Sequence, residues 1–509
     1  MLKRLCLLAA LGAMTGAWAA DPAYELLQPV VDGTGLPLAR SHEGRDYPVV
    51  RLADDALRPA FAALFAGGFP RAVLALDQLT RDLAVVTDDP CPELGEATLI
   101  SLSLEDGGYA RTGFWYAEAD GRLEFCNLHF VDVTADIETL EDGSLEELIA
   151  HEMGHVYLRR LWGDLPPGPS RNFHSAFAIT DYVTAFDEGF AAALQPLAEQ
   201  YSLTPALRAH AWGEAAPNAA DLWFSRIDRR TRKDGIRRNI FVHRTMPGEA
   251  GAGGAEAFDL RSLRTGQEML ASEGLVGTAI YRLLTSQAMP GTSCTGRPGV
   301  PAPLGCRFRK LFTALDAMRE HADAPRSPLI VLLETYAELF PDEQGALYRL
   351  FIETTFGATL DEGLRQAALT VVRAGAAGDI ASFVPGLQDL RTAQSSATGR
   401  VVAGVLRLDA AVGPELWLAA PDRLIREAPW SNAPTLPLTV NLNTAGAADL
   451  TALGLSADSA SALLDARETH GSFGSLADAL SRAQLPNAEA GLLSQAQAAF
   501  AELPAYERR

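Results

Sequence analysis

Basic residues are scarce relative to acidic ones in this 509-residue chain. Lysine and arginine total 43 against 64 aspartates and glutamates, a formal charge of −21. Binding nucleic acid phosphates takes basic groups, so a mainly nucleic-acid-binding protein is disfavoured. Glycine (44 residues) and proline (30 residues) are too few for a collagen-like or low-complexity chain. With 48% apolar residues, we expect two or three folded domains, each with its own core.

Long hydrophobic runs are absent as well, because no segment approaches the roughly 20 apolar residues that span a bilayer. The longest run near the start, Leu5–Met14, follows the basic residues Lys3 and Arg4 and precedes the small-residue pattern of Ala17–Ala19. This order is typical of a secretory signal peptide, which we place at residues 1–19. The sequence therefore predicts an exported protein, periplasmic or extracellular.

Cysteine is rare, and no pair has the CxxC-like spacing of a cysteine zinc cluster. Cys6 belongs to the predicted leader, so four cysteines remain. An even number in an exported chain indicates two disulfides, and three pairings are formally open. Loop closure favours the near partners, Cys91 with Cys126 and Cys294 with Cys306. Buried free thiols are the alternative.

The fold class follows from a change of pattern along the chain. Thr98–Leu104 alternates as a strand does, and Thr112–Tyr116 with Leu123–Phe130 brackets a turn at Ala119–Gly121, which predicts a hairpin. Apolar stripes with helical spacing follow, separated by glycine and proline. A small sheet followed by helices indicates an α+β fold. The predicted helices are Ser144–Trp162, Asp181–Tyr201, Arg261–Ser286, Phe308–Glu320 and Pro328–Gly357.

A composition break near Ser431–Pro437 predicts a linker over residues 431–440. The segment after it, residues 441–501, is rich in alanine and leucine and predicts a small all-α domain. Before the linker, residues 395–430 carry one predicted strand, Glu415–Leu418. The larger domain is expected to cover residues 20–430.

The motif HEMGH stands at residues 151–155, within the predicted helix Ser144–Trp162. Ser144 and Glu147 have the spacing of a capping box that begins this helix. Residues four apart on a helix lie one turn apart on the same face, so His151 and His155 can reach a single Zn²⁺.

Glu152 lies between the two histidines and is placed to take a proton from a zinc-activated water. Chance is a poor explanation of the motif, because a random chain of this composition contains on the order of 0.01 such matches.

A catalytic zinc needs a third protein ligand and an open position. The predicted helix Asp181–Tyr201 carries the pattern EGFA at residues 188–191, and with it the chain resembles the gluzincins, zinc metallopeptidases with a zincin-like fold. In that family the third ligand is a glutamate on the helix after the HExxH helix. The resemblance therefore implies His151, His155 and Glu188 as zinc ligands and Glu152 as the catalytic base. An ordinary exposed helix acid is the alternative for Glu188.

Two features depart from the family. Thermolysin-like members have an aspartate four residues after the ligand glutamate that orients a histidine, whereas this chain has Ala192. Asp187 or Asp181 would have to supply that contact. The substrate-amine motif of the aminopeptidases is absent from the strand before the zinc helix, so the resemblance does not imply aminopeptidase specificity.

Amide hydrolysis also needs a group that stabilises the developing oxyanion. Tyr281, His174 and His243 are the candidates, and for each one an ordinary core or surface role is the alternative.

The C-terminal segment 441–501 resembles the helix-hairpin-helix repeat of ComEA-type competence proteins, which offer hairpin backbone amides to a DNA phosphate. The first hairpin here has Gly454 but Ser456 in place of a second glycine, and the second hairpin, near Gln484–Pro486, has none. Residues 438–509 hold four arginines, no lysine and eight acids, a net charge of −4. We therefore expect this domain to pack against the enzyme or bind a protein partner, and DNA binding is disfavoured.

A basic segment, residues 226–244, contains eight arginines and lysines. We interpret it as a solvated face, with guidance of an anionic substrate as the alternative.

Taken together, the sequence predicts an exported zinc-dependent peptidase acting on a peptide or protein substrate. The rival hypothesis is an envelope scaffold protein that works through its helix-hairpin-helix domain and keeps a structural or vestigial zinc. Intact Glu152 favours the enzyme, because a structural site has no use for it.

Overall fold

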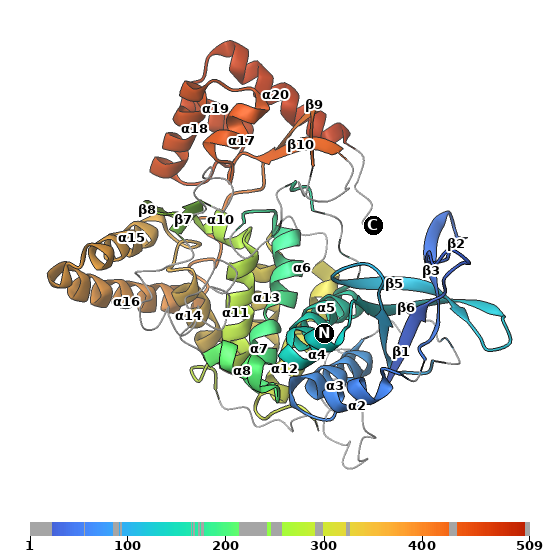
Figure 1. The fold of residues 1–509 in the computed structure, drawn as a ribbon. Coiled ribbons are helices and arrows are strands. Elements are labelled where there is room, and N and C mark those ends of the chain that lie inside the picture. The colour runs from blue at the N-terminus through green and yellow to red at the C-terminus, as the bar shows by residue number, and fades with distance from the viewer. Residues whose placement is uncertain are drawn as a thin grey trace, which may run out of the picture.

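The computed structural model is a mixed α+β architecture (Figure 1). It describes residues 23–503 except residue 55 and the segments 85–90, 92–93, 164, 166–167, 172–173, 175–177, 213–241, 246–256, 291–298, 322–325 and 427–434. The predicted leader and most of the basic segment 226–244 lie outside the described residues. The α+β prediction is confirmed at this level.

Six strands form one sheet in the order β1-β4-β6-β5-β3-β2, and β1 also pairs with β3. The hairpin prediction is confirmed, because β5 and β6 run antiparallel on either side of Gly121. The first three strands have no counterpart in the sequence prediction. The strands are β1 (Tyr24–Pro29), β2 (Ala39–His42), β3 (Arg45–Leu52), β4 (Thr98–Leu102), β5 (Gly108–Ala117) and β6 (Leu123–Val133).

Alternation along these strands builds two cores. Leu26, Ile100 and Val131 belong to the large core that the helices share. Their neighbours Leu27 and Leu99 belong to a smaller core on the other side of the sheet. Successive side chains of a strand point to opposite faces, which is why adjacent residues divide in this way.

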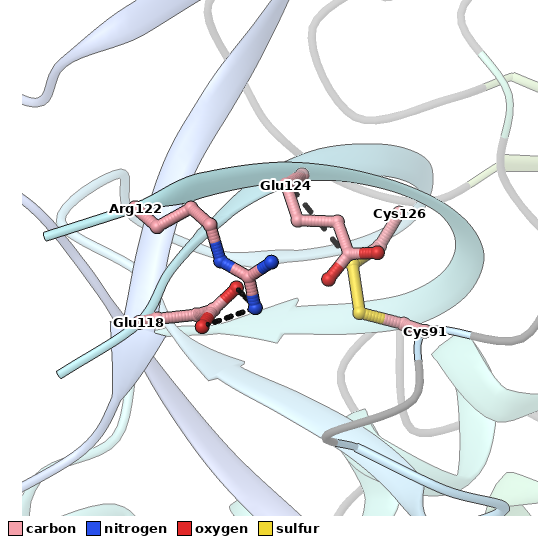
Figure 2. Close-up of a disulfide and its surroundings, with 5 residues drawn as sticks. All are labelled: Cys91, Glu118, Arg122, Glu124 and Cys126. Atoms are coloured by element: carbon pink, nitrogen blue, oxygen red, sulfur yellow. Dashed lines mark hydrogen bonds and ion pairs between the residues drawn. A yellow bond between two sulfur atoms is a disulfide. The ribbon is translucent and has the colours of Figure 1, made fainter. Parts of the chain in front are cut away.

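The predicted disulfide between Cys91 and Cys126 is confirmed and lies in the smaller core. Figure 2 shows that it joins β6 to the segment before β4, close to the Glu118–Arg122 ion pair of the β5–β6 turn. Cys306 is also disulfide-bonded. Cys294 lies outside the described residues, so the second predicted pair stays a prediction.

Several predicted helices are divided in the structure. The segment Asp181–Tyr201 forms two helices, and the second begins with Pro196 in its first turn. Pro328–Gly357 is likewise interrupted at Pro341. Proline has no N–H to donate to the preceding turn, so a helix is interrupted there and can restart with proline in its first turn.

Predicted Arg261–Ser286 begins as a strand and continues as two helices. This region contains the two-stranded sheet of β7 (Val242–Thr245) and β8 (Ala257–Leu263). The helices before the C-terminal module are α2 (Arg58–Phe65), α3 (Gly68–Leu83), α4 (Ile137–Asp142), α5 (Ser144–Trp162), α6 (Tyr182–Ala192), α7 (Gln195–Tyr201), α8 (Pro205–Trp212), α10 (Gly266–Leu270), α11 (Glu273–Thr285), α12 (Leu304–Ala317), α13 (Pro328–Leu339), α14 (Gln344–Thr354), α15 (Glu362–Ala377) and α16 (Ile380–Val402).

The C-terminal module has its own apolar core, which begins at Leu416. It contains the hairpin of β9 (Trp417–Arg426) and β10 (Thr435–Asn441), so part of the predicted linker is a strand and the module is not all-α. Four helices complete the module: α17 (Ala447–Leu453), α18 (Ala457–His470), α19 (Leu476–Ala483) and α20 (Asn487–Glu502).

Among the described residues, no single helix has the length and hydropathy of a membrane span. Helices α2 and α3 meet that test only as a pair, and they are bent by 86° relative to each other.

Candidate metal centre

The helix α5 spans Ser144–Trp162, as predicted, but its start differs from the predicted capping box. Gly143 is the N-cap residue with a φ of 87°, and Ser144 is already helical. The Asp142 carboxylate accepts hydrogen bonds from the Ser144 backbone N–H at 2.8 Å and from its hydroxyl at 2.7 Å. A serine inside the helix cannot act as its cap, so the predicted role of Ser144 is wrong.

The two histidines of the motif converge at one point on α5. Their Nε2 atoms are 3.3 Å apart, and His155 is buried with 6% exposure. One helical turn separates the two residues, which is the spacing that the sequence predicted.

Glu188 on α6 meets these histidines. Its Oε2 lies 3.6 Å from His151 Nε2 and 3.5 Å from His155 Nε2. The three ligand atoms all lie within 4.8 Å of one another. Two imidazole nitrogens and one carboxylate oxygen form a donor set typical of a catalytic zinc. The structure thus brings together all three residues that the sequence named as ligands.

Two glycines bring the helices close enough for this convergence. A Cβ at Gly154 would lie 2.6 Å from Ala191 Cα, so α5 and α6 touch backbone to backbone. A Cβ at Gly189 would lie 2.7 Å from the Glu273 carbonyl oxygen, so α11 packs equally closely on α6. The sequence analysis assigned no role to Gly154. Its place inside the motif HEMGH, on a helix that must meet a second helix, was the available signal.

Asp187 holds the ring of His155. The His155 Nδ1–H donates to Asp187 Oδ1 across 2.8 Å, so Nε2 is left to face Glu188 and His151. Of the two aspartates proposed for this contact, Asp187 makes it. Asp181 instead caps α6 by accepting from the backbone N–H groups of Val183 and Thr184. His151 Nδ1 is buried without a hydrogen-bond partner in the described part of the chain.

The charges of the cluster balance one another. Burial would lower the pKa of His155, but the carboxylates of Asp187 and Glu188 raise that pKa well above its usual value. Burial would raise the pKa of Glu188, but the charge of His155 and a hydrogen bond from His151 hold it well below its usual value. Glu188 is therefore ionised, as a metal-binding carboxylate must be.

Glu152 lies beneath the start of β5. A Cβ at Gly108 would come within 3.0 Å of Glu152 Cγ and 2.6 Å of Leu148 Cδ1, so glycine permits this close approach. Glu152 is buried with 6% exposure, although it is a carboxylate beside a histidine pair. A buried glutamate with no structural ion pair in the described residues fits a chemical role better than a stabilising one.

Of the three oxyanion candidates, the structure brings only His174 to the cluster. His174 Nδ1 lies 3.6 Å from Glu188 Oε2 and 3.5 Å from Glu273 Oε2, and its side chain is half exposed. Tyr281 donates to Gln200 Oε1 at 3.1 Å instead. The side chain of His243 lies outside the described residues.

Glu273 was missed in the sequence analysis. It is buried with 2% exposure at the start of α11, and nothing in the local pattern links it to residues of α5 and α6. Burial opposes protonation of His174, but a hydrogen bond to Glu273 and the charge of Glu188 raise its pKa to about 9.

No protein-family model matches the chain, and neither a curated protein nor a solved structure shows significant similarity to it.

Proposed function

We propose that this protein is an exported zinc-dependent peptidase of the gluzincin type. The observation that carries the proposal is the convergence of His151, His155 and Glu188 from two helices. Asp187 behind His155 supports it further, because metal-binding histidines usually donate their second ring N–H to such a partner. The predicted leader and the Cys91–Cys126 disulfide support export, because disulfides persist in oxidising compartments.

His151, His155 and Glu188 would hold the metal through Nε2, Nε2 and Oε2. A bound zinc ion supplies Lewis-acid polarisation of the substrate carbonyl and makes a water molecule acidic near neutral pH. Glu152 then takes the proton from the attacking water and passes it to the leaving amine nitrogen. Asp187 keeps the His155 ring in the tautomer and orientation that leave Nε2 free for the metal.

The substrate would lie along β5. This strand pairs with β6 along its length, whereas β3 pairs with it only at Trp115 and Tyr116. Gly107 accepts a hydrogen bond from Thr134, so by alternation Gly108 and Ala110 point their backbone groups away from β6. Arg159 of α5 already donates to the Ala110 carbonyl oxygen. An extended peptide added at this edge would pass Gly108 and therefore Glu152, which favours a peptide or protein substrate.

Two substitutions test the proposal. Glu152→Gln keeps the shape and all three ligands, so the variant should bind about one zinc while losing roughly 10²-fold or more of its activity. Glu188→Ala removes a ligand and should lose zinc and activity together. Glu338→Gln, at an exposed position on α13, is the matched control and should change neither.

Zinc content is measured on each variant beside hydrolysis of a protein substrate that the wild type cuts in a peptide-library screen. Full activity of Glu152→Gln would show that the site does not activate water. Full zinc and activity in Glu188→Ala would show that the gluzincin assignment is wrong.

A further inference from the structure

The C-terminal module contacts the part of the chain that presents Glu188. Figure 1 shows the module, in orange and red, beside α10 and α6. Thr439 of β10 donates from its hydroxyl to the Pro169 carbonyl oxygen at 2.5 Å. Pro169 lies between α5 and α6, the two helices that carry the metal ligands. The module is thus joined to the connection between these helices.

The connection is in turn held on the first turn of α6. The Ser170 backbone N–H donates to Asp181 Oδ2 at 3.1 Å, and Asp181 is fully buried. A Cβ at Gly168 would fall 2.1 Å from the same Oδ2 and 2.3 Å from Thr184 Oγ1. Residues 168–170 therefore lie directly against the start of α6, with no space for them to shift inward.

A second contact from the module reaches the same helix end. Glu415, just before the module core, accepts from the Tyr182 backbone N–H at 3.3 Å, and the Tyr182 hydroxyl reaches the Gly413 carbonyl oxygen at 3.5 Å. The first backbone amides of a helix have no partner within the helix, so outside acceptors stabilise its start. Burial and the nearby charge of Asp181 raise the pKa of Glu415 to about 8, so this carboxyl is mostly protonated at neutral pH.

The module is anchored on α10 by a buried ion pair. Arg467 of α18 lies 3.2 Å from Glu268 Oε1, and Glu268 has 1% exposure. The Ala271 carbonyl oxygen, directly after α10, accepts from the Thr180 backbone N–H at 2.8 Å. Arg467 therefore acts in an internal contact, one step away from the residue that precedes α6.

We propose that the C-terminal module positions the metal site, with Thr439 and Glu415 as positioning residues that hold the start of α6 so that Glu188 stays within reach of the two histidines. From Asp181 to Glu188, α6 makes about two turns of a rigid helix, so a shift at its start moves the carboxylate. The proposal rests on the metal site of the proposed function and does not depend on peptidase activity.

Substitutions of threonine test the proposal in the full-length protein. Thr439→Val removes the hydroxyl but keeps the shape, and it should weaken zinc binding about two- to tenfold, the range for one lost hydrogen bond. Thr439→Ser keeps the hydroxyl and should restore wild-type affinity. Thr451→Val is the matched control, because Thr451 is exposed in the same module and its hydroxyl bonds only within α17.

Zinc affinity is measured by competition with a chelator, and hydrogen exchange of residues 182–192 is measured in the metal-free protein. The expected result is weaker zinc binding and faster exchange in Thr439→Val alone. Equal affinity and equal exchange in Thr439→Val and Thr451→Val would overturn the proposal. So would a Thr439→Ser variant as impaired as Thr439→Val.

The two proposals fail in different ways. A protein that binds zinc but cuts no peptide refutes the peptidase, while the affinity and exchange data still decide the role of the module. A protein that binds no zinc leaves the exchange of residues 182–192 to decide it.

Discussion

Removal of the Asp77 carboxylate should destabilise the protein strongly, because Asp77 ties the metal-bearing helix to the sheet. Asp77 on α3 is fully buried and pairs with Arg160 of α5. It also contacts Arg81 at 3.2 Å and accepts from the Thr98 hydroxyl of β4 at 2.7 Å. Arg160 has 4% exposure, so Asp77→Ala leaves a buried cation without its counter-charge. Such a loss costs about 3–5 kcal/mol.

The same carboxylate gives a pH dependence whose sign can be worked out. Burial alone would raise the pKa of Asp77, but the charges of Arg160 and Arg81 lower it from 3.8 to about 2. The unfolded chain therefore binds more protons than the folded protein between about pH 4 and pH 2. At 1.36 kcal/mol per pKa unit, Asp77 contributes on the order of 2 kcal/mol above pH 4, and this is lost as the pH falls through 2.

Urea denaturation of the wild type and Asp77→Ala at pH 7 and pH 3 measures both effects. The variant should lose about 3–5 kcal/mol at pH 7, and its difference from the wild type should shrink at pH 3. Asp389→Ala, at an exposed position on α16, is the control and should change stability by less than about 0.5 kcal/mol. A loss below about 1 kcal/mol for Asp77→Ala, the value of a surface pair, would refute the reasoning.

Three further predictions concern the metal site, the cysteines and the C-terminal module. Asp187→Asn should weaken zinc binding about 10- to 100-fold in a chelator competition, because it alters the group that orients His155, and wild-type affinity would contradict that role. Peptide mapping without reduction should find Cys294 joined to Cys306, and a free thiol at either position would disprove the pairing. The full chain should show no DNA retention in a mobility shift at about 150 mM salt beyond a Kd of ~10⁻⁴ M, whereas micromolar binding would revive the competence-protein resemblance.

The sequence by itself determined what depends on neighbours along the chain. The bounds of α5 followed from helical periodicity, and the pairing of β5 with β6 followed from alternation around a turn. The convergence of His151 and His155 needed only the spacing of one helical turn. Glu188 came from a resemblance, because its distance from the histidines depends on how two helices meet.

Tertiary structure decided the contacts between distant segments. Gly154 matters because α6 lies against it, and Asp187 rather than Asp181 serves His155 because Asp181 is used in capping α6. Glu273 reaches His174 only because α11 packs on α6, and the three N-terminal strands join the sheet only through pairing with β4 and β5. Periodicity reports which face of an element is apolar, but the partner that covers that face is selected by packing of the whole chain.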